Sequence, residues 1–341
     1  MLMNERDRLI ASLMLDPVDR VPVISHLQTG TVDLMGASGA FWPEANRDAR
    51  KMLTLALAAH TVAGLESVKV PFDVALDSTA FGVMTGRDAI DRPPSIIEPM
   101  IHTIDDVERL NIPDPHRDGR APVVLKALSI LQEMDLRIPI FGGVIAPFML
   151  AGQMRGEEAA IMDLILNPNL MRALLSKCAE WGAIYTEAQI DAGADVITLV
   201  DATASGTILS PEQYAEFALP FQRVVVDAAH RKGSPVILHI CGDTSMNLDL
   251  MISTGADGLS VDQCMNMAWV KERTRGLCAA VGNVSPTTTL LFHSPSQVRQ
   301  ACREIMEAGT DILAPGCGIA PRTPLTNLVA MANSVKEYEG K

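Results

Sequence analysis

Short, nearly continuous apolar runs alternate along the chain with longer amphipathic stretches. Eight such runs occur, at residues 21–25, 67–70, 138–142, 195–200, 235–239, 258–261, 278–282 and 311–314. Strands that are buried on both faces have this pattern, because neither face can be polar. The pattern therefore predicts eight parallel strands.

The connecting stretches have helical periodicity and recognisable start and stop signals. The clearest cover residues 5–15, 168–192, 210–231 and 294–309. Pro211 stands at a first helical position, and Gly233 follows the end of the same stretch. Strands that alternate with helices in this way indicate a parallel α/β fold.

We therefore predict the fold class as α/β, a single (β/α)8 TIM barrel in which residues 1–341 form one domain. A helix precedes the first strand. The proline-rich stretch 88–119 interrupts the alternation after strand two, and we interpret it as an insertion with a short helix near 105–110.

Composition narrows the classes of function. The 341 residues are 48% hydrophobic and 20% charged, with a net charge of −13. A nucleic-acid partner is not expected, because the sequence has no sustained basic patch to neutralise phosphates. No apolar run reaches the roughly 18 residues of a membrane span, so we expect no membrane association and a cytoplasmic protein.

Three residues stand where catalytic side chains are expected in a barrel, at or just after the carboxyl ends of strands. His239 and Cys241 end the fifth run in the segment LHICGD, and Cys317 follows the eighth run in APGCG. In an extended segment, the His-x-Cys spacing places two side chains on the same side. The expected fold would bring all three to one mouth.

One imidazole and two thiols are a ligand set that prefers zinc, and three protein ligands leave the fourth tetrahedral position open. The alternative is a buried histidine with two inert core cysteines, since free cysteine is often buried. Two thiolates and a neutral imidazole leave a zinc site with no net charge. Such a site accepts a further thiol as its thiolate, which is a nucleophile for an alkyl group.

The chain resembles the uroporphyrinogen decarboxylase superfamily. Within it, the chain is similar to the corrinoid-dependent methyltransferases that move a methyl group from methylcobalamin to coenzyme M. The resemblance rests on PVDRVP at 17–22, QTGT at 28–31, ATASG at 202–206, LSPE at 209–212, LHICG at 238–242, VGNV at 281–284 and ILAPGCGI at 312–319. The zinc pattern of these methyltransferases maps onto His239, Cys241 and Cys317.

The resemblance implies a zinc-dependent methyltransferase. His239, Cys241 and Cys317 would be the catalytic residues and hold zinc, and a zinc-bound thiolate of the acceptor would attack the methyl group. The methyl donor would be methylcobalamin or another methylated corrinoid. A separate corrinoid protein would deliver it, because the chain has no Asp-x-His-x-x-Gly motif.

Four residues near strand ends are candidates for binding the substrate: Gln28, Asp201, Asp262 and Asn283. Asp262 is followed by Gln263, where these methyltransferases tend to have a glutamate, so the role of that glutamate is not carried over. Arg322 is a further candidate, for contact with an anionic substrate tail.

Three alternatives stay open. In a uroporphyrinogen decarboxylase, two arginines after the first strand hold substrate carboxylates, but residues 27–31 are LQTGT. A tetrapyrrole would therefore lose its main charge partners. Tetrahydrofolate is an alternative methyl acceptor with a nitrogen nucleophile. A metal-binding or corrinoid-docking module without turnover is the non-catalytic alternative.

Overall fold

The computed structural model describes residues 2–86 and 89–338. Its strands form a parallel six-stranded sheet in which spatial order follows sequence order. The strands are β1 (Val68–Lys69), β2 (Ile140–Ile145), β3 (Val196–Val200), β4 (Val236–Ile240), β5 (Gly258–Val261) and β6 (Ala279–Val281). Each overlaps one of the expected apolar runs, so the predicted parallel α/β fold is confirmed.

The two other expected strands, at residues 21–25 and 311–314, form only isolated bridges. These parallel bridges join Val281 of β6 to Ile312, and Val23 to Leu313. The backbone N–H of Glu66, just before β1, donates to the carbonyl oxygen of Val23 at 2.8 Å. The two segments thus hydrogen-bond to each other and to residues at both edges of the sheet.

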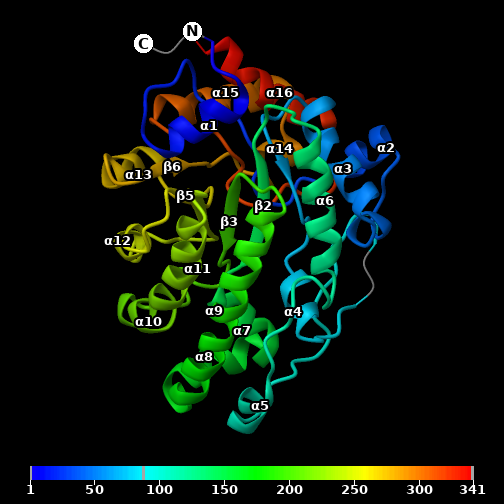
Figure 1. The fold of residues 1–341 in the computed structure, drawn as a ribbon. Helices are drawn as coiled ribbons and strands as arrows, with labels where there is room; N and C mark the ends of the chain where they lie inside the picture. Colours follow the sequence, from blue (N-terminus) through cyan, green and yellow to red (C-terminus); the bar gives the residue numbers. More distant parts are fainter. Residues whose placement is uncertain (1, 87–88, 339–341) are drawn as a thin grey trace.

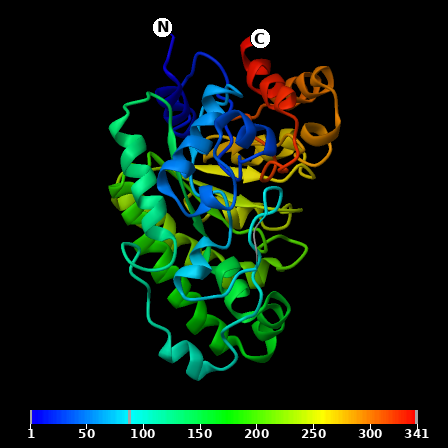
Figure 2. The ribbon, with the colours of Figure 1, turned by 90° about the vertical axis from the view of Figure 1, so that its right-hand side faces the viewer.

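Three of the expected helical stretches each form one helix. The structure contains α1 (Glu5–Leu13), α9 (Pro168–Asp191) and α15 (Pro295–Glu307). The others are α2 (Val32–Ser38), η1 (Glu44–Asn46), α3 (Ala49–Thr61), α4 (Leu76–Ala80), α5 (Ile104–Arg109), α6 (Ala121–Glu133), α7 (Pro147–Arg155), α8 (Glu157–Leu166), α10 (Pro211–Phe217), α11 (Leu219–Arg231), α12 (Leu248–Ile252), α13 (Met267–Thr274), α14 (Thr289–Phe292) and α16 (Leu325–Glu337). Helices surround the strands in both ribbon views (Figures 1 and 2).

The prediction of a single helix over residues 210–231 was wrong. The structure has two helices there, α10 and α11, which meet at Ala218. Pro220 lies in the first turn of α11. A proline lacks the N–H that a continuous helix needs, and its ring clashes with the preceding turn. The chain therefore begins a new helix there.

The expected insertion lies between β1 and β2. Its short helix is α5, which begins with a capping box formed by Thr103 and Asp106. Asp88, the expected first residue of the insertion, lies outside the described residues. Figure 1 shows α4, α5, α7 and α8 together at the end of the molecule opposite the termini. Because α7 begins directly after β2, this is the end where that strand finishes.

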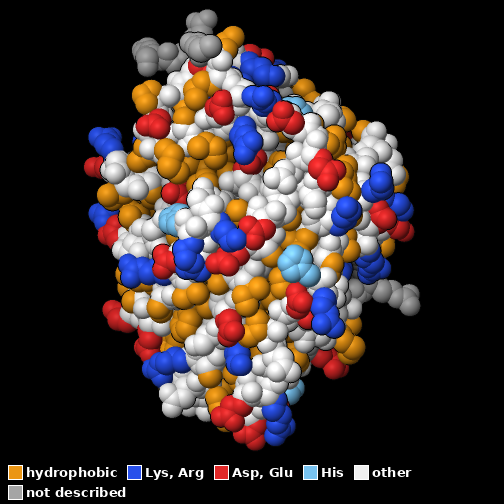
Figure 3. All heavy atoms as spheres, viewed as in Figure 1, with side chains coloured by type: hydrophobic (Ala, Val, Ile, Leu, Met, Phe, Trp, Pro, Cys, Tyr) orange, Lys and Arg blue, Asp and Glu red, His pale blue; other side chains and the backbone are white. Residues whose placement is uncertain are grey.

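Charged side chains of both signs are interspersed on the face shown in Figure 3. Among the described residues, no helix has the length and apolarity required to cross a membrane.

Candidate metal centre

The register of the sheet places His239 between two neighbouring strands. It pairs with Val200 of β3 on one side and with Ser260 of β5 on the other. Its side chain is fully buried. Cys241 follows β4 directly, and Gly242 then turns the chain away with a φ of +75°. A positive φ strains residues with a Cβ, which explains glycine at this position.

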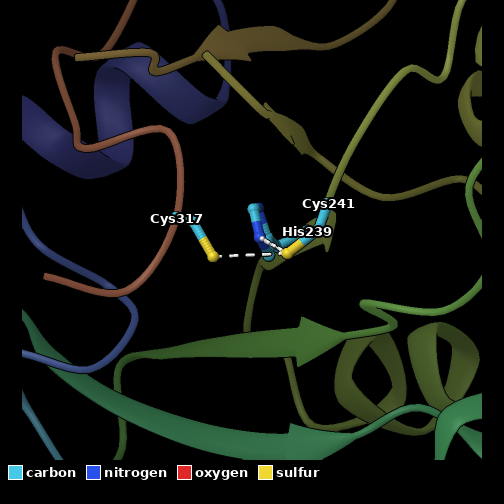
Figure 4. A group of neighbouring side chains, drawn as sticks. All are labelled: His239, Cys241 and Cys317. Atoms are coloured by element: carbon cyan, nitrogen blue, oxygen red, sulfur yellow. Dashed lines mark hydrogen bonds between the residues drawn. The ribbon is translucent and has the colours of Figure 1, made fainter. Parts of the chain in front are cut away.

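Cys317 reaches the same place from the far end of the sequence. Its loop lies tightly against the loop after β5, because a Cβ at Gly316 would stand 2.6 Å from the backbone nitrogen of Gln263. The Sγ atoms of Cys317 and Cys241 lie 3.3 Å apart, and Cys241 Sγ lies 3.2 Å from His239 Nε2 (Figure 4). One potential ligand atom from each residue falls within 4.8 Å of the other two. The predicted convergence of these three side chains is present.

A serine on the neighbouring strand orients the His239 ring. His239 Nδ1 lies 3.0 Å from Ser260 Oγ and 3.2 Å from the Ser260 carbonyl oxygen. These acceptors favour a proton on Nδ1, which leaves the Nε2 lone pair facing the thiols. Histidines that bind metals are usually held in this way by a hydrogen bond from their other nitrogen. The donor set thus fits zinc in both chemistry and orientation.

The pKa values of the two thiols are shifted in opposite directions. The hydrogen bond from the Cys241 thiol lowers the pKa of the Cys317 thiol. The same contact raises the pKa of Cys241, since a second thiolate would lie beside the first. The cluster therefore stabilises a single thiolate by itself. A divalent cation would offset the repulsion and favour the second thiolate as well.

The three side chains form one wall of a cavity of about 130 Å³. Apolar side chains, among them Leu27, Phe72 and Val144, contribute much of the remaining lining. Lys69 of β1 and Asp77 of α4 also line it. Space of this size suits a small molecule rather than a macrocycle.

Gln28 is the one candidate for substrate binding that lines this cavity. Its Nε2 donates to the carbonyl oxygen of Ile319 at 2.7 Å. Its Oε1 is buried and has no hydrogen-bond partner among the described residues.

Asp201 was expected to bind the substrate, but its carboxylate is held by other residues away from the cavity. One carboxylate oxygen accepts from the backbone N–H of Met149 at 3.0 Å, and the other accepts from Gln222 Nε2 at 2.7 Å. The side chain is fully buried, and burial raises its pKa to about 7. It does not line the cavity, and its contacts join β3 to α7 and α11.

Asp262 and Asn283 also do not line the cavity. Asn283 Nδ2 donates to the carbonyl oxygens of Asp262 and Met265, at 3.0 and 2.8 Å. One carboxylate oxygen of Asp262 accepts from the backbone N–H of Cys264 at 3.0 Å. These contacts brace the loop after β5. Arg322 is exposed and pairs with Asp91, so it also lies away from the cavity.

Sequence reasoning missed Ser260 and Lys69. Nothing in the sequence singles out Ser260, because its role depends on pairing with His239 in the next strand. Lys69 did leave a signal, since it is a lysine within a short apolar run that is expected to be buried.

The family model for uroporphyrinogen decarboxylase (URO-D) matches residues 4–338. The chain belongs to this family. It is 37% identical to the methylcobamide:CoM methyltransferase MtbA of Methanosarcina acetivorans, with 98% of each chain covered. It is 35% identical to the methylcobamide:CoM methyltransferase MtaA of Methanosarcina barkeri, again with 98% of each covered.

A solved methyltransferase from Methanosarcina mazei has a similar structure. The TM-score is 0.92, at 35% sequence identity, and the match covers 98% of this chain and 99% of the other. The resemblance stated from the sequence motifs is therefore confirmed at the level of family and fold.

Proposed function

We propose that this protein is a methyltransferase that moves a methyl group from a methylated corrinoid to a thiol such as coenzyme M. The observation that carries the proposal is the convergence of His239, Cys241 and Cys317 within 4.8 Å. Relatives that match nearly the whole chain are named methylcobamide:CoM methyltransferases, which supports the same reaction.

In this proposal His239, Cys241 and Cys317 hold zinc. When bound, zinc supplies a vacant coordination position that favours the thiolate form of an acceptor thiol. Ser260 keeps His239 Nε2 directed at the site. The apolar walls limit water around the reacting sulfur, and Gln28 lines the same cavity.

The proposal extends to the architecture and the partner. We assign the segments 21–25 and 311–314 as strands one and eight of a closed (β/α)8 barrel, and residues 1–341 as one domain. A corrinoid protein presents the methyl group at the cavity, which is too small to enclose a macrocycle. A reducing compartment such as the cytoplasm suits this role, because the ligand cysteines must remain thiols.

Two observations disfavour uroporphyrinogen decarboxylation. The segment after residues 21–25 reads LQTGT and provides no arginine for substrate carboxylates. The cavity beside the thiols is also far smaller than a tetrapyrrole requires.

The test compares Cys241→Ala with Cys264→Ser. Both residues lie near the site, but Cys264 is exposed and is not a member of the ligand cluster. The purified protein is assayed for zinc content and for methyl transfer from methylcobalamin to coenzyme M. We expect Cys241→Ala to lose both, and Cys264→Ser to keep about one zinc per chain and its activity. Full activity in Cys241→Ala would refute the proposal.

Zinc-edge X-ray absorption provides a second readout that does not depend on turnover. The loaded protein should show two sulfur ligands and one nitrogen ligand. Addition of coenzyme M should increase the number of sulfur ligands to three.

A further inference from the structure

A buried lysine lies in the same cavity as the thiol cluster. Lys69 is 6% exposed, and it is the one basic side chain besides His239 among the described residues that line the cavity. Lysine is rarely buried without a partner, because its charge loses hydration. What the ammonium contacts is therefore informative.

The strand next to β1 makes room for the Lys69 side chain. A Cβ on Gly143 of β2 would stand 2.7 Å from Lys69 Nζ and 3.2 Å from its Cε. The absence of a side chain at Gly143 therefore lets the ammonium lie against the backbone at the cavity wall. The neighbouring Gly142 faces the other way, toward Gln189 and Ile197.

The ammonium has unused hydrogen-bonding capacity. It donates to the carbonyl oxygen of Pro71, which is its single hydrogen bond among the described residues. An ammonium carries three N–H donors. Two of them therefore have no acceptor among the described residues, and Lys69 lines the cavity.

Two carboxylates line the cavity as well, but each is already engaged. Arg120 holds Asp73 with two hydrogen bonds, at 2.6 and 2.8 Å. Asp77 is buried and accepts from Trp181 Nε1 at 3.0 Å, and burial raises its pKa to about 7. Within the part of the chain that the structure describes, neither carboxylate lies within ion-pair distance of Lys69.

The positive charge of Lys69 is thus poorly compensated. Burial lowers the pKa of its ammonium to about 8, although Asp73 and Asp77 oppose that shift. An anionic group in the cavity would satisfy the free N–H donors and stabilise the charged form.

We propose that Lys69 is the residue that selects the acceptor, by binding the acid group at the end of the thiol opposite the sulfur. The sulfur lies toward His239, Cys241 and Cys317, the short apolar link lies along Phe72 and Val144, and the acid group lies against Lys69. This assignment rests on the proposed function and adds the residue that decides which thiol is used.

The first experiment uses the wild-type, zinc-loaded protein and thiols of similar length. These are 2-mercaptoethanesulfonate, 3-mercaptopropionate, neutral 2-mercaptoethanol and cationic cysteamine, each with methylcobalamin as donor. We expect kcat/KM to fall from the anionic thiols to the neutral thiol and then to the cationic thiol. The two anionic thiols distinguish a sulfonate site from a carboxylate site. Equal kcat/KM for all four would overturn the proposal.

The second experiment replaces Lys69 with methionine, which keeps the length of the side chain but removes its charge. Loss of a charged hydrogen-bond donor should raise KM for the preferred anionic thiol by roughly 10–100-fold. The KM for 2-mercaptoethanol should change little in the same variant. Ethanesulfonate, which has no thiol, should inhibit methylation of 2-mercaptoethanol by the wild type but not by Lys69→Met.

Two glycine variants test the role of Lys69 without replacing it, and they remain informative if Lys69→Met does not fold. Gly143→Ala places a methyl group against Lys69 Nζ, whereas Gly142→Ala places one against Gln189 on the opposite face of β2. Both crowd the same strand. We expect Gly143→Ala to reduce the preference for anionic over neutral thiols, and Gly142→Ala to retain it.

The outcomes separate this inference from the proposed function. If no thiol is methylated and zinc is absent, the function fails. If thiols are methylated but Lys69→Met and Gly143→Ala keep the wild-type preference for anions, the function stands and the role of Lys69 is refuted.

Discussion

His239 Nδ1 lies 3.0 Å from Ser260 Oγ, and the two residues are direct partners in the pairing of β4 with β5. The contact determines which ring nitrogen faces the two thiols. The site is thus organised by the register of the sheet as well as by its own loops.

Ser260→Ala should weaken zinc binding. The variant removes the hydroxyl acceptor but keeps the backbone carbonyl oxygen, which lies 3.2 Å from Nδ1. Loss of a hydrogen-bond partner of a metal-binding histidine lowers metal affinity by about 10–100-fold. Because the carbonyl oxygen remains as an acceptor, we expect the affinity for zinc to fall by about 10-fold. Competition with a chromophoric chelator measures the affinity.

Ser253→Ala is the matched control. Ser253 is an exposed serine at the end of α12, and its hydroxyl donates to the backbone carbonyl oxygen of Asp249. It should bind zinc like the wild type. If the two variants have equal affinities, the Ser260 hydroxyl does not orient the ligand.

The buried carboxyl of Asp201 should make the stability of the protein depend on pH. Its carboxyl has an ordinary pKa of 3.8, and burial raises that pKa to about 7 in the folded protein. Between these values the folded state binds the proton more tightly than the unfolded state does. The free energy of unfolding should therefore fall as the pH rises from about 4 to 7, by at most about 1.4 kcal/mol per pH unit from this group.

Denaturant unfolding of the wild type and Asp201→Asn across this pH range measures that contribution. The variant cannot titrate, so its stability should depend less on pH. A residual slope should remain, because burial also raises the pKa of Asp77 to about 7. Identical slopes in the two proteins would contradict the assignment.

Much of the fold was predictable because its signals are local. Six of the eight apolar runs became strands, and α1, α9 and α15 begin and end close to their predicted limits. The runs at 21–25 and 311–314 were found as well, but they make only isolated bridges. The break before Pro220 was missed because apolar periodicity continued across it, although the proline itself was a local signal for a new helix.

The site was predictable only in part, for a related reason. His239 and Cys241 share one strand end, and glycines mark the Cys317 segment, so these residues stand out in the sequence. Asp201 also ends a strand, but the direction of its side chain depends on Met149 and Gln222. Such contacts come from distant elements, and spacing along the chain does not encode them.

Replacement of Arg322 should have no effect on stability or on acceptor binding. Its side chain is 76% exposed and pairs with Asp91 at the surface. Exposed pairs of this kind contribute little to stability. Arg322→Ala should leave the thermal midpoint and the KM for every acceptor thiol unchanged within error. A large rise in KM for anionic thiols alone would place the acid-binding position at Arg322 instead of Lys69.

Removal of zinc should destabilise the protein through the ligand cluster alone. A ligand that binds only the folded state at 100 times its dissociation constant adds about 2.7 kcal/mol of stability. For a chain of this size that corresponds to a fall of a few degrees in the thermal midpoint when a strong chelator is added. Calorimetry of wild type and Cys317→Ala, with and without chelator, tests this. The wild type should respond and the variant should not, because Cys317 is one of the three proposed zinc ligands. An equal response in both would mean that the chelator acts at another site.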